Sequence, residues 1–166
     1  MVKDQFQTAI ASDSAQLVSQ SLSLENLQGK HSMETQVVAE NGYQPLILIA
    51  EDNEANILTI SGFLEMSGYR LEVARDGQEA IALAQESCPD LILMDVQMPE
   101  IDGLAATRYL RSNPDTANIP IVILTALAMV GDRERCLESG ASAYLSKPVK
   151  FKELLQLVKR LLQGEQ

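Results

Sequence analysis

The stretch LILIAED, residues 46–52, is an apolar run of strand length that ends on two acids. Three further apolar runs also end on polar residues. They are LILM (91–94) before Asp95, IVIL (121–124) before Thr125, and AYLS (143–146) before Lys147 and Pro148. Continuous apolar runs predict parallel strands covered on both faces. In such a sheet the residues after the strands meet at one edge, where ligands bind.

Segments of helical pattern separate the apolar runs, and Arg70 begins a further strand-like run. The alternation predicts an α/β fold, a doubly wound parallel sheet with right-handed crossovers. In the helix before Gly140, we expect Cys136 and Leu137 on the inner side. Strands are expected at 46–50, 70–74, 91–94, 121–124 and 143–145, and helices at 53–66, 78–86, 104–111, before Gly140 and at 151–162.

Composition divides the chain near Pro45. Residues 1–44 are polar and predict a tail or inter-domain linker, in which a short docking helix is the alternative. Residues 45–166 are long enough for one domain with its own core. The formal net charge of −10 argues against nucleic acid as a direct partner. With no apolar run of membrane length and no signal-peptide core, we expect a cytoplasmic protein.

The strand-end acids suit a divalent cation. Hard carboxylate oxygens favour Mg²⁺, which is commonly held by one or two carboxylates together with waters and phosphate. Asp52 and Asp95 are the expected direct ligands, and Glu51 is expected to act through water. The backbone carbonyl of Gln97 is expected to complete the shell. The alternative is an acidic loop that only caps the following helix.

Asp95 is the candidate nucleophile, because carboxylates form aspartyl-phosphate intermediates. Lys147 would meet a phosphoryl oxygen as a point charge, and the Thr125 hydroxyl would donate a hydrogen bond to another. Each of these residues also has an ordinary structural explanation. Their occurrence after successive strands is what favours phosphoryl chemistry.

On these motifs the sequence resembles the receiver domain of two-component response regulators. The resemblance covers residues 45–163 and rests on LILIAEDN, LILMDVQMPEIDG, IVILTA and YLSKP, in that order. It implies a (βα)5 flavodoxin-like fold with strand order 2-1-3-4-5 and dependence on Mg²⁺. It also implies phosphoryl transfer to Asp95 from the phosphohistidine of a histidine kinase or a phosphotransfer protein. The protein would catalyse its own phosphorylation and dephosphorylation rather than act as a separate enzyme.

The resemblance further implies a switch and a cis peptide at Lys147–Pro148. Thr125 would move toward the phosphoryl group and Tyr144 would turn inward. These movements would change the surface of the fourth helix, fifth strand and fifth helix, which would bind a downstream protein or a second copy. Gln97 and Leu127 match the positions that tune phosphoryl lifetime. The apolar Leu127 predicts slow loss of the phosphoryl group.

Two nearby residues have structural interpretations. Gly103 is expected to permit unusual backbone angles in the loop after Asp95. Asn56 lies one helical turn past Asp52 and either bonds near the acid pair or only packs.

Two other classes of protein share part of this pattern. A phosphatase that uses an aspartyl-phosphate typically needs an acid at position 97, where this chain has Gln97. A pseudo-receiver interaction module would lack part of the acid set. Within the receiver class, we expect either a stand-alone regulator or the C-terminal receiver of a hybrid histidine kinase, and the polar lead-in favours the second.

Overall fold

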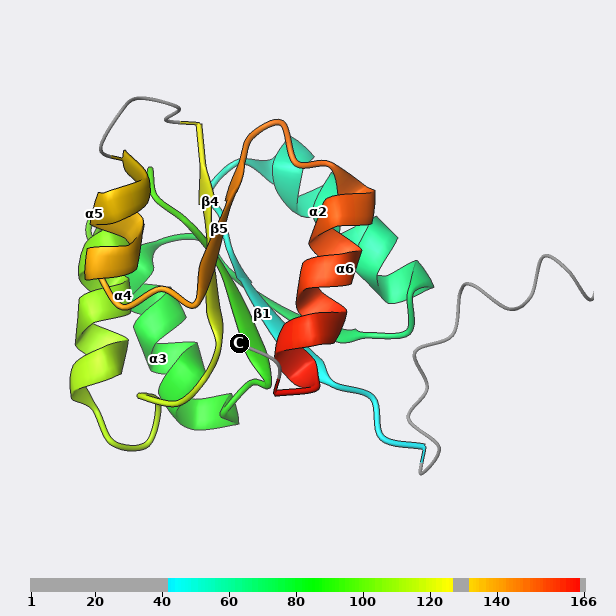
Figure 1. Cartoon of the computed structure of the whole chain (residues 1–166), viewed down its shortest axis with the longest axis horizontal. Helices are drawn as coiled ribbons and strands as arrows, with labels where there is room; N and C mark the ends of the chain where they lie inside the picture. Colours follow the sequence, from blue (N-terminus) through cyan, green and yellow to red (C-terminus); the bar gives the residue numbers. More distant parts are fainter. Residues whose placement is uncertain (1–41, 127–131, 165–166) are drawn as a thin grey trace, which may run out of the picture. The chain divides into compact units, whose positions relative to one another are not determined.

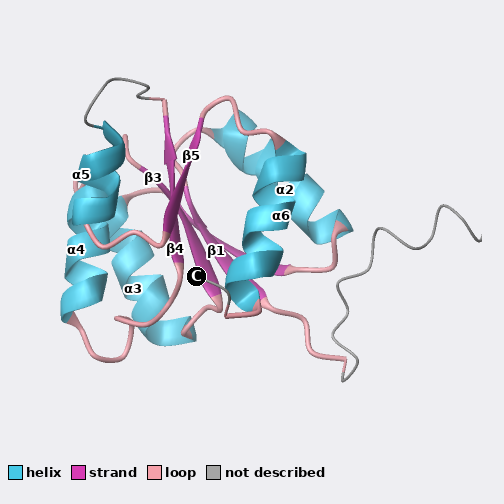
Figure 2. Cartoon of the chain, in the orientation of Figure 1, coloured by secondary structure: helices cyan, strands magenta, loops and turns pink. Residues whose placement is uncertain are grey.

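A computed structural model describes residues 42–126 and 132–164. Within these residues, five parallel strands form one sheet in the order β2-β1-β3-β4-β5 (Figures 1 and 2). This order confirms the predicted flavodoxin-like α/β fold. The strands are β1 (Leu46–Ala50), β2 (Arg70–Ala74), β3 (Leu91–Asp95), β4 (Ile121–Thr125) and β5 (Ala143–Ser146). The helices are α2 (Glu54–Met66), α3 (Gly77–Ser87), α4 (Gly103–Ser112), α5 (Asp132–Glu138) and α6 (Phe151–Leu162).

Helices cover both faces of the sheet, with α3, α4 and α5 on one side and α2 and α6 on the other (Figure 1). Every residue of β1, β3 and β4 is buried, as their continuous apolar sequences predict. Successive side chains alternate between two cores: Leu48 belongs to the core under α3 and α4, and Ile49 to the core under α2 and α6.

The second core joins the beginning and the end of the domain. Leu64 of α2 and Leu154 of α6 are both fully buried in it. The rings of Phe63 and Phe151 lie with their centroids 4.7 Å apart and add an aromatic contact between the same two helices. This contact holds α2 against α6.

Two predictions about local packing are wrong. Cys136 is buried in the core, but Leu137 is 44% exposed, because the short helix α5 turns only a narrow stripe inward. Gly103 does not have a positive φ. It opens α4 where a Cβ atom would lie 1.9 Å from the backbone oxygen of Asp95. Glycine is needed there because the start of α4 approaches the end of β3 closely, and not because of an unusual backbone angle.

The amino-terminal prediction falls almost wholly on residues that the structure does not describe. Residues 1–41 lie outside the described part of the chain, so a tail or linker there stays a prediction. The Tyr43 hydroxyl donates a hydrogen bond to the Asp90 carboxylate, and lies 2.9 Å from its Oδ1 and 2.8 Å from its Oδ2. The described residues contain no helix long and apolar enough to cross a membrane.

Candidate functional site

The carboxyl edge of the sheet carries the predicted site. Backbone hydrogen bonds extend the strand ladder beyond β1 and β5: the Glu51 amide donates to Ala74 at 3.0 Å and the Lys147 amide donates to Thr125 at 2.7 Å. The strand register therefore fixes the backbone that precedes each polar side chain. Asp95 and Thr125 are themselves the last residues of β3 and β4.

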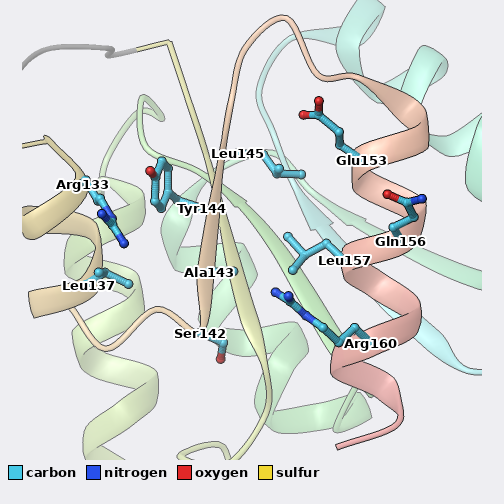
Figure 3. Close-up of a pocket in the computed structure, with 10 residues that line it drawn as sticks. All are labelled: Arg133, Leu137, Ser142, Ala143, Tyr144, Leu145, Glu153, Gln156, Leu157 and Arg160. Carbon is cyan, nitrogen blue, oxygen red and sulfur yellow. The ribbon is translucent and has the colours of Figure 1, made fainter. Parts of the chain in front are cut away.

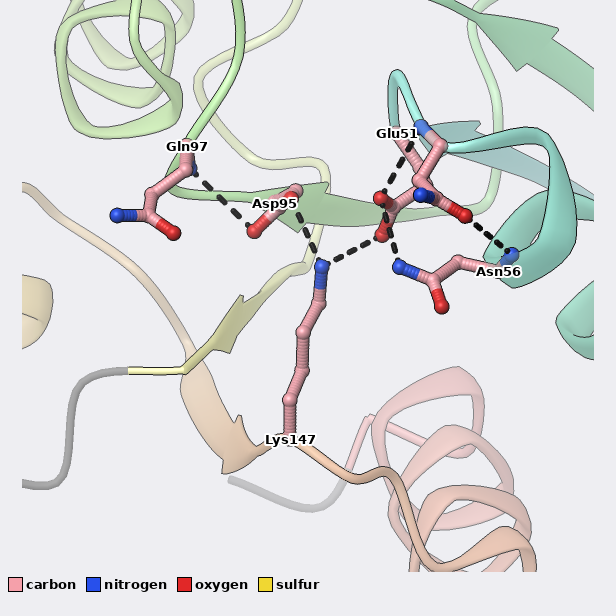
Figure 4. Close-up of polar contacts among 6 residues, drawn as sticks. Glu51, Asn56, Asp95, Gln97 and Lys147 are labelled. Atoms are coloured by element: carbon pink, nitrogen blue, oxygen red, sulfur yellow. Dashed lines mark hydrogen bonds and ion pairs between the residues drawn. The ribbon is translucent and has the colours of Figure 1, made fainter.

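Lys147 is the centre of the site (Figure 4). Its Nζ lies 2.7 Å from Glu51 Oε2 and 2.8 Å from Asp95 Oδ2. The lysine side chain is 19% exposed, and the two carboxylate side chains are 1% and 6% exposed. One ammonium thus separates two buried acids that would otherwise repel each other.

Glu51 is held on both of its oxygens. Oε1 accepts hydrogen bonds from Asn56 Nδ2 at 3.0 Å and from the Asn53 amide at 3.3 Å, while Oε2 faces Lys147. Asn53 is also the N-cap of α2, where its side chain accepts from the Asn56 amide at 3.1 Å. The first turn of α2 therefore orients the first acid. Of the two alternatives for Asn56, the structure supports bonding beside the acid pair.

Burial and neighbouring charges govern the ionisation of Asp95 and Lys147. Burial is the largest influence on Asp95 and raises its pKa, and the charge of Glu51 raises it further. Lys147 and the Gln97 amide, 3.3 Å from Asp95 Oδ1, oppose this rise without cancelling it. Burial alone lowers the pKa of Lys147, but its bonds to Asp95 and Glu51 outweigh burial, so the pKa is raised.

Three carboxylates gather at this edge. Glu51, Asp52 and Asp95 offer ligand atoms within 4.8 Å of one another. Asp52 is exposed, whereas the other two are buried. Three negative charges beside one ammonium leave a local excess of negative charge, and hard oxygen donors suit a divalent cation such as Mg²⁺. The residues present therefore fit the predicted cation.

The residues predicted for the switch lie on two neighbouring strands. Thr125 is 2% exposed at the end of β4, and Tyr144 is 37% exposed on β5. The Tyr144 ring lies on the α5 side of β5, near Arg133 and Leu137 (Figure 3). Leu127, predicted to tune the phosphoryl lifetime, lies outside the described residues.

A groove of about 530 Å³ follows β5 between α5 and α6. Its lining combines apolar side chains with arginines on both helices: Leu137, Tyr144, Leu145, Leu157, Arg133 and Arg160. This groove occupies the surface that the sequence predicted for partner binding. The peptide bond between Lys147 and Pro148, which follows β5, is cis, as predicted.

This fold and this edge define a class of signalling domain. The sequence profile of the response regulator receiver domain matches residues 47–159, and the chain belongs to that family. It is a receiver domain of two-component signalling. The polar-differentiation response regulator DivK of Brucella anthropi is 42% identical over 116 residues, which are 70% of this chain and 94% of DivK.

Solved receiver domains share the fold. The signal receiver domain of a signal transduction histidine kinase from Syntrophus aciditrophicus is 42% identical, with a TM-score of 0.69 over 72% of this chain and 91% of that one. The receiver domain of a sensor histidine kinase from Pseudomonas aeruginosa is 40% identical, with a TM-score of 0.69 over 73% and 99%. That structure has a magnesium ion coordinated in its active-site cleft.

Sequence reasoning identified the acids and the lysine but not the arrangement that supports them. The division of Glu51 between Lys147 on one oxygen and two amides on the other was not predicted. The EDNEAN stretch at 51–56 carries the signal, because an N-cap asparagine and an amide three residues later stand beside the acid pair.

Proposed function

We propose that Asp95 accepts a phosphoryl group from the phosphohistidine of a histidine kinase or a histidine phosphotransfer protein. The observation that supports this most directly is the position of Lys147, whose ammonium contacts buried Asp95 and Glu51 beside a third acid. A carboxylate held next to a cation, at the edge where ligands bind in such sheets, suits attack on phosphorus.

The transfer balances as a substitution at phosphorus. A carboxylate oxygen of Asp95 forms the new O–P bond, and the N–P bond of the phosphohistidine breaks. The bonding pair leaves on the imidazole nitrogen, and the imidazole departs neutral because its other ring nitrogen already carries a proton. Lys147, whose pKa is raised, remains an ammonium and turns from the carboxylates to a phosphoryl oxygen. The Thr125 hydroxyl donates to another phosphoryl oxygen.

We propose Mg²⁺ as the cation of the acid cluster. Asp52 and Asp95 are its proposed direct ligands, Glu51 acts through water, and the backbone carbonyl of Gln97 completes the shell. When bound, the cation neutralises negative charge that develops on the transferring phosphoryl group. The acid cluster itself is the support for this assignment.

We propose that phosphorylation is read out on the surface of α5, β5 and α6. Thr125 would move toward the phosphoryl group, and Tyr144, now partly exposed, would turn inward and reshape the groove. A downstream protein or a second copy of the chain would bind there. Gln97 and Leu127 would tune the phosphoryl lifetime, with Leu127 slowing its loss.

The cellular setting follows from the proposed donor. Phosphohistidine is made in the cytoplasm at the expense of ATP, so the domain would act there. The relatives include the response regulator DivK, of which the match covers 94%, and the receiver domain of a histidine kinase. A stand-alone regulator and a receiver within a hybrid kinase would therefore both suit this role.

Phosphorylation at Asp95 can be tested with a small donor. The full chain, incubated with Mg²⁺ and acetyl phosphate, should gain the mass of one phosphoryl group, and chelation of Mg²⁺ should prevent the gain. Asp95→Asn should abolish the adduct, whereas Asp115→Asn, a change at an exposed acid distant in sequence from the site, should leave it intact. An adduct that persists in Asp95→Asn would contradict the proposal.

A further inference from the structure

We infer that Asn56 is a positioning residue of the acceptor site, which holds Glu51 so that Glu51 can hold Lys147 against Asp95. The inference rests on the proposed phosphoryl transfer. It gives a role in that transfer to a residue other than the three acids, Thr125 and Lys147. Asn56 would touch neither the phosphoryl group nor the acceptor oxygen, and would act only through Glu51.

The first argument is the way in which the oxygens of Glu51 are divided. Oε2 contacts Lys147 Nζ at 2.7 Å, and Oε1 accepts from Asn56 Nδ2 at 3.0 Å (Figure 4). With only 1% of its side chain exposed, Glu51 is shielded from the solvent that would otherwise hydrate its carboxylate. Its orientation therefore depends on these protein donors.

The second argument is the way in which Asn56 itself is held. Its backbone amide donates to the N-cap side chain of Asn53 at 3.1 Å. The cap fixes the position of Asn56 on the first turn of α2 without using its side chain. The side-chain amide is thus free to reach back to Glu51, and a substitution at position 56 leaves the cap bond in place.

The third argument is charge. A neutral amide donates a hydrogen bond to the buried carboxylate without competing with Lys147 for a negative partner. An aspartate of the same shape would place a further negative charge beside Glu51, and would attract the lysine away from the acceptor. The site therefore needs the amide for its donor and its neutrality, not for its volume.

The test compares three variants in the rate of phosphorylation by acetyl phosphate across a range of Mg²⁺ concentrations. Asn56→Ala should slow the reaction about 10-fold or more, the size expected when a residue that orients a site is lost. Asn56→Asp should slow it at least as much. Thr59→Ala, three residues further along α2, should stay within about twofold, because its hydroxyl bonds only to the Ala55 carbonyl.

A double-mutant cycle separates positioning from a general effect on folding. If Asn56 acts through Glu51, Asn56→Ala should have almost no further effect in a Glu51→Ala background. A second readout needs no reaction: Glu51→Gln should shift the side-chain amide resonances of Asn56 in the NMR spectrum of the Mg²⁺-free protein. Thr59→Ala should leave those resonances unchanged.

The outcomes are distinct. Wild-type rates in Asn56→Asp, or full additivity with Glu51→Ala, would overturn the inference while the phosphoryl acceptor at Asp95 stood. Absence of any adduct in the wild-type chain would instead refute the proposed function, and the inference with it.

Discussion

Lys147 is the residue on which the site depends, because it contacts two acids that are almost wholly removed from water. The contact with Lys147 does not offset the effect of burial on Asp95, so the pKa of Asp95 stays raised. In the Mg²⁺-free protein, ionised Asp95 is therefore less favourable in the folded state than in the unfolded chain. A bound cation would offset part of this cost.

The raised pKa of Asp95 predicts that the stability of the Mg²⁺-free protein depends on pH. Where Asp95 is ionised in both the folded and the unfolded state, Asp95→Asn should be more stable than wild type. As pH falls through the raised folded pKa toward the ordinary value of 3.8, folded Asp95 binds its proton before the unfolded chain does. The wild type then regains stability, and the gap between the two proteins should narrow.

Urea unfolding of both proteins, followed by circular dichroism from neutral pH downward, measures that gap. Glu100→Gln, a change at an exposed acid in the loop after β3, should show no comparable gap at neutral pH. A gap that stays constant with pH, or an Asp95→Asn protein less stable than wild type at neutral pH, would refute the prediction.

At the scale of elements, the helices that follow β2 and β3 begin with capping acids. Asp76 accepts from the Glu79 amide at 2.7 Å at the start of α3, and Asp102 accepts from the Ala105 amide at 2.7 Å at the start of α4. Glu79 also reaches back to the Arg75 amide at 2.7 Å. Two backbone donors that the helix cannot satisfy are thereby paired at the start of α3.

Asp76→Ala should therefore destabilise the domain by about 1 kcal/mol, the usual cost of losing an N-cap. Asp76→Asn keeps an acceptor at the cap and should lose much less. Gln78→Ala, an exposed change in the same turn, should be neutral or slightly stabilising because alanine favours the helix. Thermal and urea unfolding would measure all three, and equal stability of Asp76→Ala and Gln78→Ala would contradict the role of the cap.

At the scale of the whole molecule, Arg111 of α4 ties separate segments together. Its Nε donates to the Gly140 carbonyl at 2.7 Å, and Nη1 donates to the carbonyls of Ala117 at 3.1 Å and Ile119 at 2.8 Å. These carbonyls belong to the connections before β4 and β5. One side chain thus joins α4 to the start of two strands at the edge opposite the site.

Arg111→Lys should cost about 2 kcal/mol, because a single ammonium cannot reproduce the forked donors and leaves carbonyls unpaired. The same change at Arg108, an exposed residue of the same helix, should cost less than about 0.5 kcal/mol. Urea unfolding compares the two. Similar stabilities would show that the hydrogen bonds of Arg111 contribute little.

The architecture was predictable from the sequence because the relevant signals are local. An apolar run such as LILIA needs cover on both faces wherever it occurs, and strand and helix periods are read within a few residues. The strand-end acids, Thr125 and Lys147 could be placed at one edge of the sheet for the same reason. Element ends were less predictable: β3, β4 and β5 each extend one residue further than predicted, through Asp95, Thr125 and Ser146.

Chain order and right-handed crossovers dictate, from the residues alone, which chemical groups reach the carboxyl edge. How those groups are shared depends on the folded arrangement: Lys147 lies between two acids, Glu51 between Lys147 and Asn56, and Gly103 against the backbone of Asp95. Distance explains the difference. A hydrogen bond or a steric contact depends on tenths of an ångström between segments remote in sequence, and those separations exist only once strands have paired and helices have packed.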